Sequence, residues 1–130
     1  MGMTALARTT QIKLTNSSGS PLNQGDVVVF DNALAQSVTV TAILRETLRT
    51  AGVVLEPNGI PAGSSGMIAT GGWVPRINLI APASIGWKIG TSNTYGRGTA
   101  SHGSPAIGDF AEALSSGSTP EALLWGRQII

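Results

Sequence analysis

The sequence predicts an all-β protein, folded as a compact small β-barrel or sandwich of short antiparallel strands with at most one or two helical turns. Three observations predict this fold class. The apolar runs are short and are punctuated by glycine, of which the chain has 17. Residues 37–41 alternate between polar and apolar side chains, which is the period of a half-buried strand. No segment sustains the 3.6-residue period of a long amphipathic helix.

One pattern occurs twice along the chain. It consists of a glycine-led apolar strand, a polar stretch, a second glycine-led strand, and a small-residue turn into a last strand. The first copy runs from Gly25 to Val74 and the second from Gly86 to Gly126. Short strands separated by glycine are typical of small barrels and sandwiches. The repeat adds the alternative that the barrel consists of two similar halves.

Residues 1–8 show no periodicity and are expected to form a flexible N-terminal arm, followed by a single β-barrel domain over residues 9–130. About nine or ten short strands are expected in this domain. The ranges with a strand pattern are 9–15, 26–30, 37–41, 52–56, 67–70, 73–80, 87–90, 110–114 and 123–129. The continuous apolar run at 26–30 predicts a strand buried on both faces. Pro75 and Pro82 lack a backbone donor, so we expect strand edges, ends or bulges there.

Three segments leave alternatives open. Residues 42–50 place leucines and arginines four apart, which fits one or two helical turns, and an extended excursion fits almost as well. A helical turn is also open at residues 120–123, where Pro120 can take the first helical position. Residues 91–107 lack a core pattern and predict a surface loop or a hairpin.

Charge and composition narrow the function classes. The chain has 130 residues, with 8 lysines and arginines against 7 aspartates and glutamates. This balance lacks the basic excess of most nucleic-acid-binding proteins, so no nucleic acid partner is expected. Only 12% of the residues are charged, which suits a protein whose surface is mostly covered by other proteins. No membrane contact and no signal peptide are expected, and without cysteine no disulfide or thiolate site can form.

Few residues offer catalytic chemistry. His102 is the only histidine, and a nucleophilic system of Ser101, His102 and Asp109 is open because imidazole can activate a hydroxyl. Such triads are assembled across a fold rather than within one loop, so a solvated histidine is favoured. A single histidine without cysteine cannot supply the usual zinc ligands. We therefore predict no enzymatic activity, no catalytic residue, no cofactor and no metal site.

The acidic and tryptophan residues have structural explanations. The carboxylates beside glycine-led strands are expected to accept hydrogen bonds from turn amides; they are Asp26, Asp31, Glu56, Asp109 and Glu112. The tryptophans are expected to anchor the core or a subunit interface; they are Trp73, Trp87 and Trp125.

Several glycine-led segments carry a resemblance to one known group of proteins. They are residues 25–29, 51–56, 60–68, 72–74, 86–92 and 107–114. Together they resemble the small β-barrel proteins that decorate tailed-phage capsids, the head-stabilising or cement proteins. The resemblance covers most of residues 20–130. The insertion from residue 34 to residue 51 is longer than in many such proteins.

The resemblance implies a non-enzymatic viral structural protein on the outer surface of the capsid, often a homotrimer. Its partner would be the major capsid protein, and bridging neighbouring copies would stabilise the head against the pressure of packaged DNA. The candidate contact residues are Thr4, Leu6, Arg8, Arg45, Arg49, Trp125, Ile129 and Ile130. Each group has a simpler explanation, namely a disordered arm, solvated arginines and a core tryptophan.

Two other function classes stay open. Another virion component, such as a tail or fibre protein or a host-binding module, would use exposed tryptophans and residues 91–107 as its recognition surface. A small hydrolase would depend on His102, and loss of activity on His102→Ala would identify it.

Overall fold

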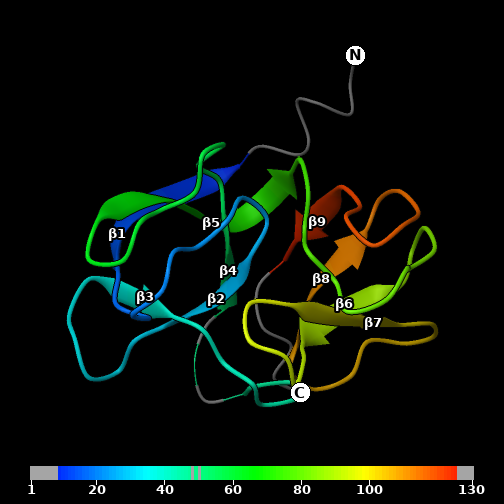
Figure 1. Cartoon of the computed structure of the whole chain (residues 1–130). Helices are drawn as coiled ribbons and strands as arrows, with labels where there is room; N and C mark the ends of the chain where they lie inside the picture. The colour runs from blue at the N-terminus through cyan, green and yellow to red at the C-terminus, as the bar shows by residue number, and fades with distance from the viewer. Residues whose placement is uncertain (1–8, 48, 50, 126–130) are drawn as a thin grey trace.

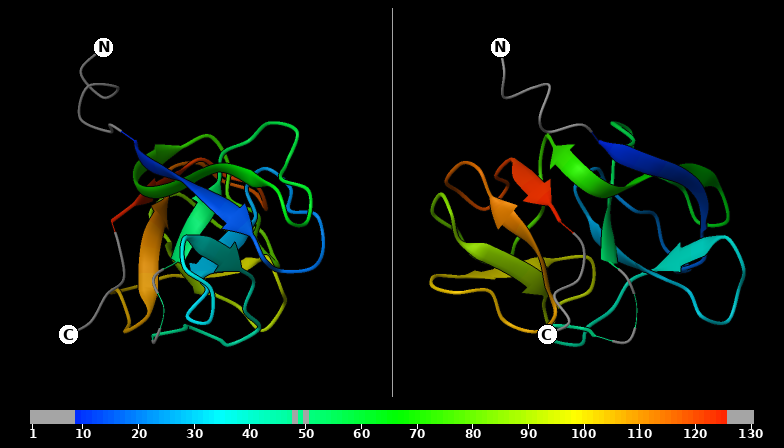
Figure 2. Two further views of the ribbon diagram at one scale, coloured as in Figure 1. Left: turned by 90° about the vertical axis from the view of Figure 1, so that its left-hand side faces the viewer. Right: turned by 180° about the vertical axis from the view of Figure 1, so that it is seen from behind.

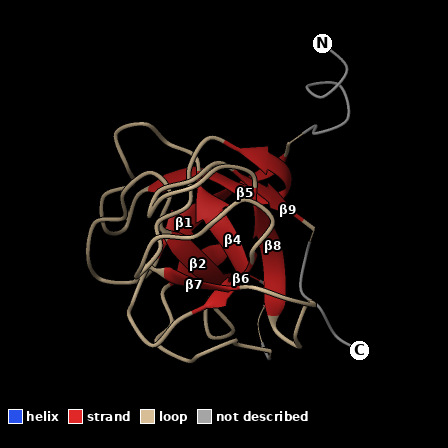
Figure 3. Ribbon diagram, turned by 90° about the vertical axis from the view of Figure 1, so that its right-hand side faces the viewer, coloured by secondary structure: helices blue, strands red, loops and turns tan. Residues whose placement is uncertain are grey.

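Nine strands and no helix make up the described part of the chain, residues 9–47, 49 and 51–125 of a computed structural model (Figures 1 and 3). The strands are β1 (Thr10–Asn16), β2 (Val27–Phe30), β3 (Ser37–Thr39), β4 (Ala51–Val54), β5 (Ser65–Val74), β6 (Lys88–Thr91), β7 (Gly98–Ser101), β8 (Asp109–Ala113) and β9 (Ala122–Leu124). The all-β fold class predicted from the sequence is confirmed. The expected arm at residues 1–8 and the end of the expected strand at 123–129 lie outside the described residues.

The strands β1 to β5 form a closed barrel. Their order is β1-β3-β2-β4-β5, and β5 returns to pair with β1. The pairs are antiparallel except for β1 and β3, which run parallel where Thr15 and Asn16 face Ser37 and Val38. Because the ring of strands is closed, little backbone edge is left unpaired on this side of the molecule.

The end of β5 also begins a second, open sheet with the order β5-β9-β8-β6-β7. Residues 72–74 of β5 pair with β9, whereas the earlier part of β5 pairs with β1 and β4. One strand of 10 residues thus includes all of the strand expected at 67–70 and the first two residues of the strand expected at 73–80. The barrel and the open sheet lie side by side in Figure 1 and, seen from behind, in Figure 2.

Two apolar cores hold these strands together. The smaller one belongs to the barrel and its loops, and its buried members are Leu14, Leu22, Val28, Val38, Val54, Ile60 and Ile68. The larger one joins barrel residues such as Val27 and Val29 to sheet residues such as Ile89 and Phe110. Successive side chains of β2 therefore belong to different cores, and the predicted burial of this strand on both faces is confirmed.

Two elements predicted beside prolines are wrong, whereas the strand end expected at Pro75 is confirmed. The expected strand at 73–80 ends at Val74, because the next residue, Pro75, cannot donate to a ladder. The residues that follow bond to loops instead, with the N–H of Ile77 donating to the carbonyl oxygen of Pro120 over 2.9 Å. The helical turn at 120–123 is also wrong, because Ala122 pairs with both Val74 and Ala113 as the first residue of β9.

The structure also decides the two other open segments. Arg45 has a φ of 51°, which is incompatible with a right-handed helix. The described residues of segment 42–50 therefore form an irregular excursion and the helical alternative is wrong. In segment 91–107 the hairpin alternative is confirmed, because β7 pairs antiparallel with β6 from Lys88 opposite Ser101 to Thr91 opposite Gly98.

Candidate functional site

Residues 42–47, which we call the strap, lead from β3 toward β4 and are bonded to the open sheet through Thr91. The hydroxyl of Thr91 donates to the carbonyl oxygen of Ile43 over 2.8 Å and accepts from the N–H of Glu46 over 2.6 Å. The N–H of Arg45 donates to the carbonyl oxygen of Thr91 over 2.9 Å. Thr91 is only 1% exposed, so these bonds are shielded from water and fix the strap on the sheet.

Arg45 is held by two side chains of the open sheet. Its Nε donates to Oδ1 of Asp109 over 3.1 Å, and its Nη2 donates to Oγ of Ser101 over 2.7 Å. The side chain of Asp109 is fully buried, whereas 27% of the Arg45 side chain is exposed. The left-handed backbone of Arg45 costs about 1 kcal/mol, which this network offsets. The sequence suggested Arg45 as a contact to a partner, and the structure places its guanidinium in an ion pair within the chain.

Arg49 is also paired within the chain. Its Nη2 donates to Oε1 of Glu46 over 3.1 Å, and the hydroxyl of Thr41 lies 3.3 Å from the same oxygen. Glu46 is 3% exposed. Each arginine therefore directs its charge toward a buried carboxylate, and the charges cancel in pairs at the base of the strap.

Asp26 and Asp109 close the same kind of turn in the two halves of the fold. The glycine before each has a positive φ, 88° for Gly25 and 94° for Gly108. The N–H of each aspartate donates over 3.0 Å to the carbonyl oxygen three residues earlier, and one carboxylate oxygen accepts from the N–H of that same residue over 2.8 Å. The prediction that these carboxylates accept bonds from turn amides is confirmed.

Large apolar side chains are exposed on the loops of the described chain. Ile43 and Leu44 form the tip of the strap and are 53% and 56% exposed. Ile107 is also exposed and precedes Gly108, which lies so close to the strap that an added Cβ would stand 2.5 Å from the carbonyl oxygen of Arg45. Sequence reasoning missed this tip because it concentrated on the arginines. The available signal was the adjacency of Ile43 and Leu44, since an element with only one buried face cannot bury two neighbouring side chains.

The other predicted contact residues are only partly placed. Trp125 is half-buried, and its N–H donates to the carbonyl oxygen of Phe110 over 2.9 Å. Five residues lie outside the described part of the chain: Thr4, Leu6, Arg8, Ile129 and Ile130. Of the other tryptophans, Trp87 packs against the larger core, and Trp73 donates from Nε1 to Oε1 of Glu121 over 2.9 Å at the surface.

His102 is not joined to the nucleophilic system that the sequence left open. Its ring stacks edge-on against Trp87, with centroids 6.0 Å apart and an interplanar angle of 68°. The hydroxyl of Ser101 and the carboxylate of Asp109 both accept hydrogen bonds from Arg45 instead. Among the described contacts, neither group shares a hydrogen bond with the imidazole.

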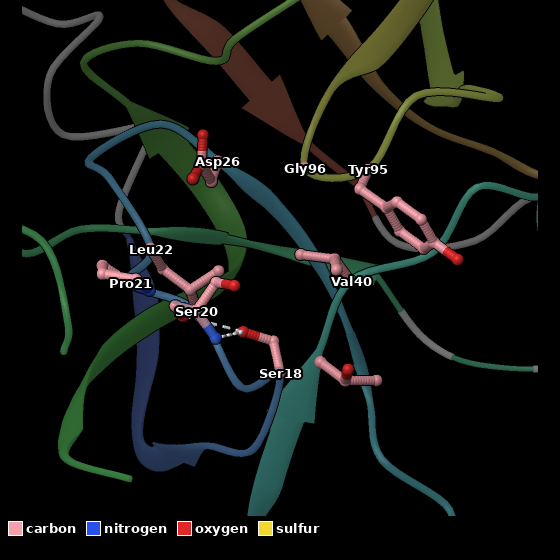
Figure 4. Close-up of a pocket in the computed structure, with 9 residues that line it drawn as sticks. Ser18, Ser20, Pro21, Leu22, Asp26, Val40, Tyr95 and Gly96 are labelled. Atoms are coloured by element: carbon pink, nitrogen blue, oxygen red, sulfur yellow. Dashed lines mark hydrogen bonds between the residues drawn. The ribbon is translucent and has the colours of Figure 1, made fainter. Parts of the chain in front are cut away.

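An open pocket of about 540 Å³ lies beside the barrel (Figure 4). It is lined by Ser18, Ser20, Pro21, Leu22, Asp26, Thr39, Val40, Tyr95 and Gly96. The hydroxyl of Ser18 donates to Oδ1 of Asn16 over 2.7 Å, and the ring of Tyr95 points away from Asp26 in Figure 4. Among the described residues, this lining contains no histidine, cysteine or lysine that could act as a base or nucleophile.

The described ranges contain neither a cluster of metal-binding side chains nor a membrane-spanning helix. Within residues 9–47, 49 and 51–125, no group of three or more His, Cys, Asp or Glu side chains is placed to hold a metal ion. Nor do these residues contain a helix that could span a membrane.

A comparison with protein-family models finds no match, and a comparison with curated proteins finds no similar sequence. Function must therefore be inferred from the fold, the surface and the residues of the chain itself.

Proposed function

We propose that this chain is a non-enzymatic structural protein of a tailed-phage virion. It binds the outer surface of the capsid as a homotrimer, bridges neighbouring major capsid proteins and stabilises the head against internal DNA pressure. The observation that carries the proposal is a compact all-β body that exposes large aliphatic side chains on its loops. One of these loops is the strap, which hydrogen bonds hold on the open sheet. The resemblance of segments 25–29, 51–56 and 107–114 to decoration proteins suggests the partner.

The surface supports a function in assembly. Nine large hydrophobic side chains are exposed in the described part of the chain, and only 12% of all residues are charged. A monomer that works alone in solution usually has about twice that share of charged residues. Exposed aliphatic groups release water when they are covered, which contributes about 25 cal/mol for each Å² of apolar area buried.

The stabilising mechanism follows from binding across a seam. Internal pressure pulls neighbouring capsid proteins apart, so a protein attached to both must be removed from one before the seam opens. A standard interface of about 1,600 Å² can reach micromolar affinity, equivalent to about 8 kcal/mol. Joining the sites in a trimer raises the effective concentration of each remaining site once the first is bound. Moderate single contacts are then sufficient to hold the seam.

Binding to capsids tests the proposal. Purified chain is added to empty capsids, lacking this chain, of the phage that encodes it. We expect saturable binding, additional density on the outer surface by electron microscopy, and a higher temperature of capsid disruption. Capsids that bind none of the chain and open at an unchanged temperature would refute the proposal.

The terminal segments remain predicted contacts. Deletion of residues 2–8 is expected to weaken capsid binding while the circular dichroism spectrum stays unchanged, because the arm would order only on the capsid. Unaltered affinity would remove Thr4, Leu6 and Arg8 from the interface.

One observation favours a second candidate, a tail, fibre or host-binding protein. Tyr95 is 67% exposed at the rim of the open pocket and lies in segment 91–107, and exposed tyrosines are frequent recognition residues. Binding of the purified chain to host cells but not to capsids would support this candidate, and loss of that binding on Tyr95→Ser would place the contact.

A further inference from the structure

We infer that the strap contacts an uncharged apolar groove of the major capsid protein through Ile43 and Leu44, and that Arg45 and Arg49 are positioning residues which hold this tip in place. The inference rests on the proposed function and refines it. It reverses the roles expected from the sequence, where the arginines were the contact candidates. Three features of the strap carry it: its exposure, its anchoring and its charge balance.

The tip is exposed although its backbone is firmly anchored. Ile43 and Leu44 are more than half exposed, whereas the carbonyl oxygen of Ile43 and the N–H of Glu46 both bond to the hydroxyl of Thr91, a residue that is 1% exposed. A loop that is fixed before binding loses little conformational entropy on binding. Most of the free energy gained by burying the aliphatic side chains of such a loop therefore contributes to affinity.

The backbone of the strap is held in a costly conformation. Arg45 has a φ of 51°, and the carbonyl oxygen of Arg45 lies against Gly108, where an added Cβ would stand 2.5 Å away. Left-handed backbone at a non-glycine residue persists only where surrounding contacts enforce it, and it is frequent at binding sites. In this strap the left-handed residue directly follows the two exposed apolar residues Ile43 and Leu44.

The charges at the base of the strap indicate the chemistry of the partner. Nε of Arg45 lies 3.1 Å from Oδ1 of Asp109, and Nη2 of Arg49 lies 3.1 Å from Oε1 of Glu46. Both carboxylates are buried, so each arginine is neutralised from within the chain. An acidic partner would have to compete with these pairs, whereas an uncharged apolar groove would cover the tip without disturbing them.

The experiment compares the exposed tip with a single leucine that is exposed to the same extent elsewhere on the described surface. The double variant Ile43→Ser with Leu44→Ser is measured against Leu34→Ser, because Leu34 is 55% exposed and Leu44 is 56% exposed. We expect the tip variant to bind empty capsids about tenfold more weakly or worse, and Leu34→Ser to bind within about twofold of the unchanged chain. Circular dichroism and thermal unfolding verify that both variants are folded.

Salt dependence separates an apolar contact from an arginine contact. We expect the affinity of the unchanged chain to vary by less than about threefold between about 50 and 500 mM sodium chloride. Arg45→Gln is expected to weaken binding by displacing the tip while the dependence on salt stays shallow. A steep dependence in the unchanged chain that becomes shallow in Arg45→Gln would show that the guanidinium itself contacts the capsid, and would overturn the inference.

A labelled variant keeps the test decisive if the double variant does not fold. Because the chain has no cysteine, Leu44→Cys and Leu34→Cys each accept a single polarity-sensitive fluorophore. Capsid binding is expected to shift the emission at position 44 to the blue and to leave position 34 unchanged. Binding without a shift at position 44, or a shift caused by self-association alone, would refute the inference and leave the proposed function intact. No binding by the unchanged chain would refute both.

Discussion

In the barrel, Oδ1 of Asp26 accepts a hydrogen bond from Nδ2 of Asn78 over 2.8 Å, whereas in the open sheet Oδ1 of Asp109 accepts one from Nε of Arg45 over 3.1 Å. The two turns have the same backbone bonds and the same positive φ at the preceding glycine. The partner is a neutral amide in one and a cation in the other. The comparison teaches that a repeated sequence pattern can specify a turn while the distant residue that completes it differs.

A third turn has the same backbone without a carboxylate. The N–H of Trp87 donates to the carbonyl oxygen of Ser84 over 3.1 Å, and Gly86 has a φ of 89°. An added Cβ at Gly86 would meet no atom within 4 Å. A side chain added at Gly86 therefore costs only the free energy of the left-handed backbone conformation, without the steric contacts that it would make at Gly25 or Gly108.

The largest expected effects come from replacing these glycines by alanine. Gly86→Ala should cost only the conformational strain, about 1 kcal/mol of unfolding free energy. Gly25→Ala adds contacts at 2.9 Å with the side chains of Arg76 and Asn78, which can partly move away, so we expect about 2 kcal/mol. Gly108→Ala meets the backbone oxygen of Arg45 at 2.5 Å, and we expect about 4 kcal/mol.

Urea denaturation of the three alanine variants measures this series. Equal losses at Gly25, Gly86 and Gly108 would mean that φ alone decides the cost and that the strap does not press on the turn of the open sheet. A variant that fails to fold only at Gly108 would agree with the expected order.

The next largest effect should distinguish the two carboxylates. Asp109→Ala leaves Nε of Arg45 without its anionic acceptor and the N–H of Ala106 without the carboxylate, and we expect a loss of about 3 kcal/mol. Asp26→Ala leaves a neutral amide, which also donates to the carbonyl oxygen of Gln24 over 3.1 Å, and we expect about 2 kcal/mol.

The double variant Asp109→Ala with Arg45→Gln sharpens the same comparison. Removing the charge of Arg45 should restore part of the lost stability, because the unpaired cation is then absent. Strictly additive losses in thermal unfolding would contradict the ion pair. Asp26→Ala with Arg45→Gln serves as the control and should be additive, since the two sites share no hydrogen bond among the described contacts.

A smaller loss is expected at the anchor of the strap. Thr91→Val keeps the shape of the side chain but leaves the carbonyl oxygen of Ile43 and the N–H of Glu46 without the hydroxyl, at a cost of about 2 kcal/mol. The amide of Glu46 should also exchange faster with solvent in hydrogen-exchange measurements. Thr99→Val, which changes a half-buried hydroxyl on the neighbouring strand β7, should have little effect on either quantity. Similar exchange rates at Glu46 in both variants would mean that Thr91 does not hold the strap.

Local patterns predicted the strands that fill the cores, and distant contacts determined the rest. The run at 26–30 and the segment at 110–114 are apolar enough to identify β2 and β8 without their partners. Strand β7 has the sequence of a loop, and its pairing with β6 makes it a strand. At Gly98 the packing is close, because an added Cβ would lie 3.1 Å from the side chains of Ile89 and Leu79.

The candidate site was harder to predict than the fold. Arg45 and its partner Asp109 are 64 positions apart, so no local pattern could show that the guanidinium is paired. The exposure of Ile43 and Leu44 depends on the same long-range contacts. A helix over 42–50 with its leucines turned inward would have buried Leu44 and exposed the arginines. In the structure Leu44 is 56% exposed, and Arg45 and Arg49 are paired with buried carboxylates.

The smallest expected effect concerns Asp31, an aspartate at the end of β2 that differs from Asp26 and Asp109 in lying near the surface. Its Oδ2 accepts from the hydroxyl of Ser17 over 2.6 Å and its Oδ1 accepts from the N–H of Ala33 over 2.9 Å. These bonds, that of Ser17 first, hold the pKa of the carboxyl below its ordinary value of 3.8. A depressed pKa in the folded state means that Asp31 adds stability above the unfolded-state value and loses it as the pH falls through the folded-state value.

Ser17→Ala tests this surface carboxylate because it removes the larger cause of the shift. We expect the pKa of Asp31, followed by nuclear magnetic resonance of its carboxyl carbon, to rise toward 3.8. The stability contributed by the Asp31 carboxylate should therefore be smaller in the variant at neutral pH, and the unchanged chain and the variant should converge in this contribution once the carboxyl is protonated in acid. Ser20→Ala, a hydroxyl in the same loop that does not contact Asp31, should leave the pKa unchanged. An unmoved pKa in Ser17→Ala would assign the depression to the backbone amides. The carboxylate of Asp31 would then be held mainly by backbone N–H groups, which also bond to the carboxylates of Asp26 and Asp109.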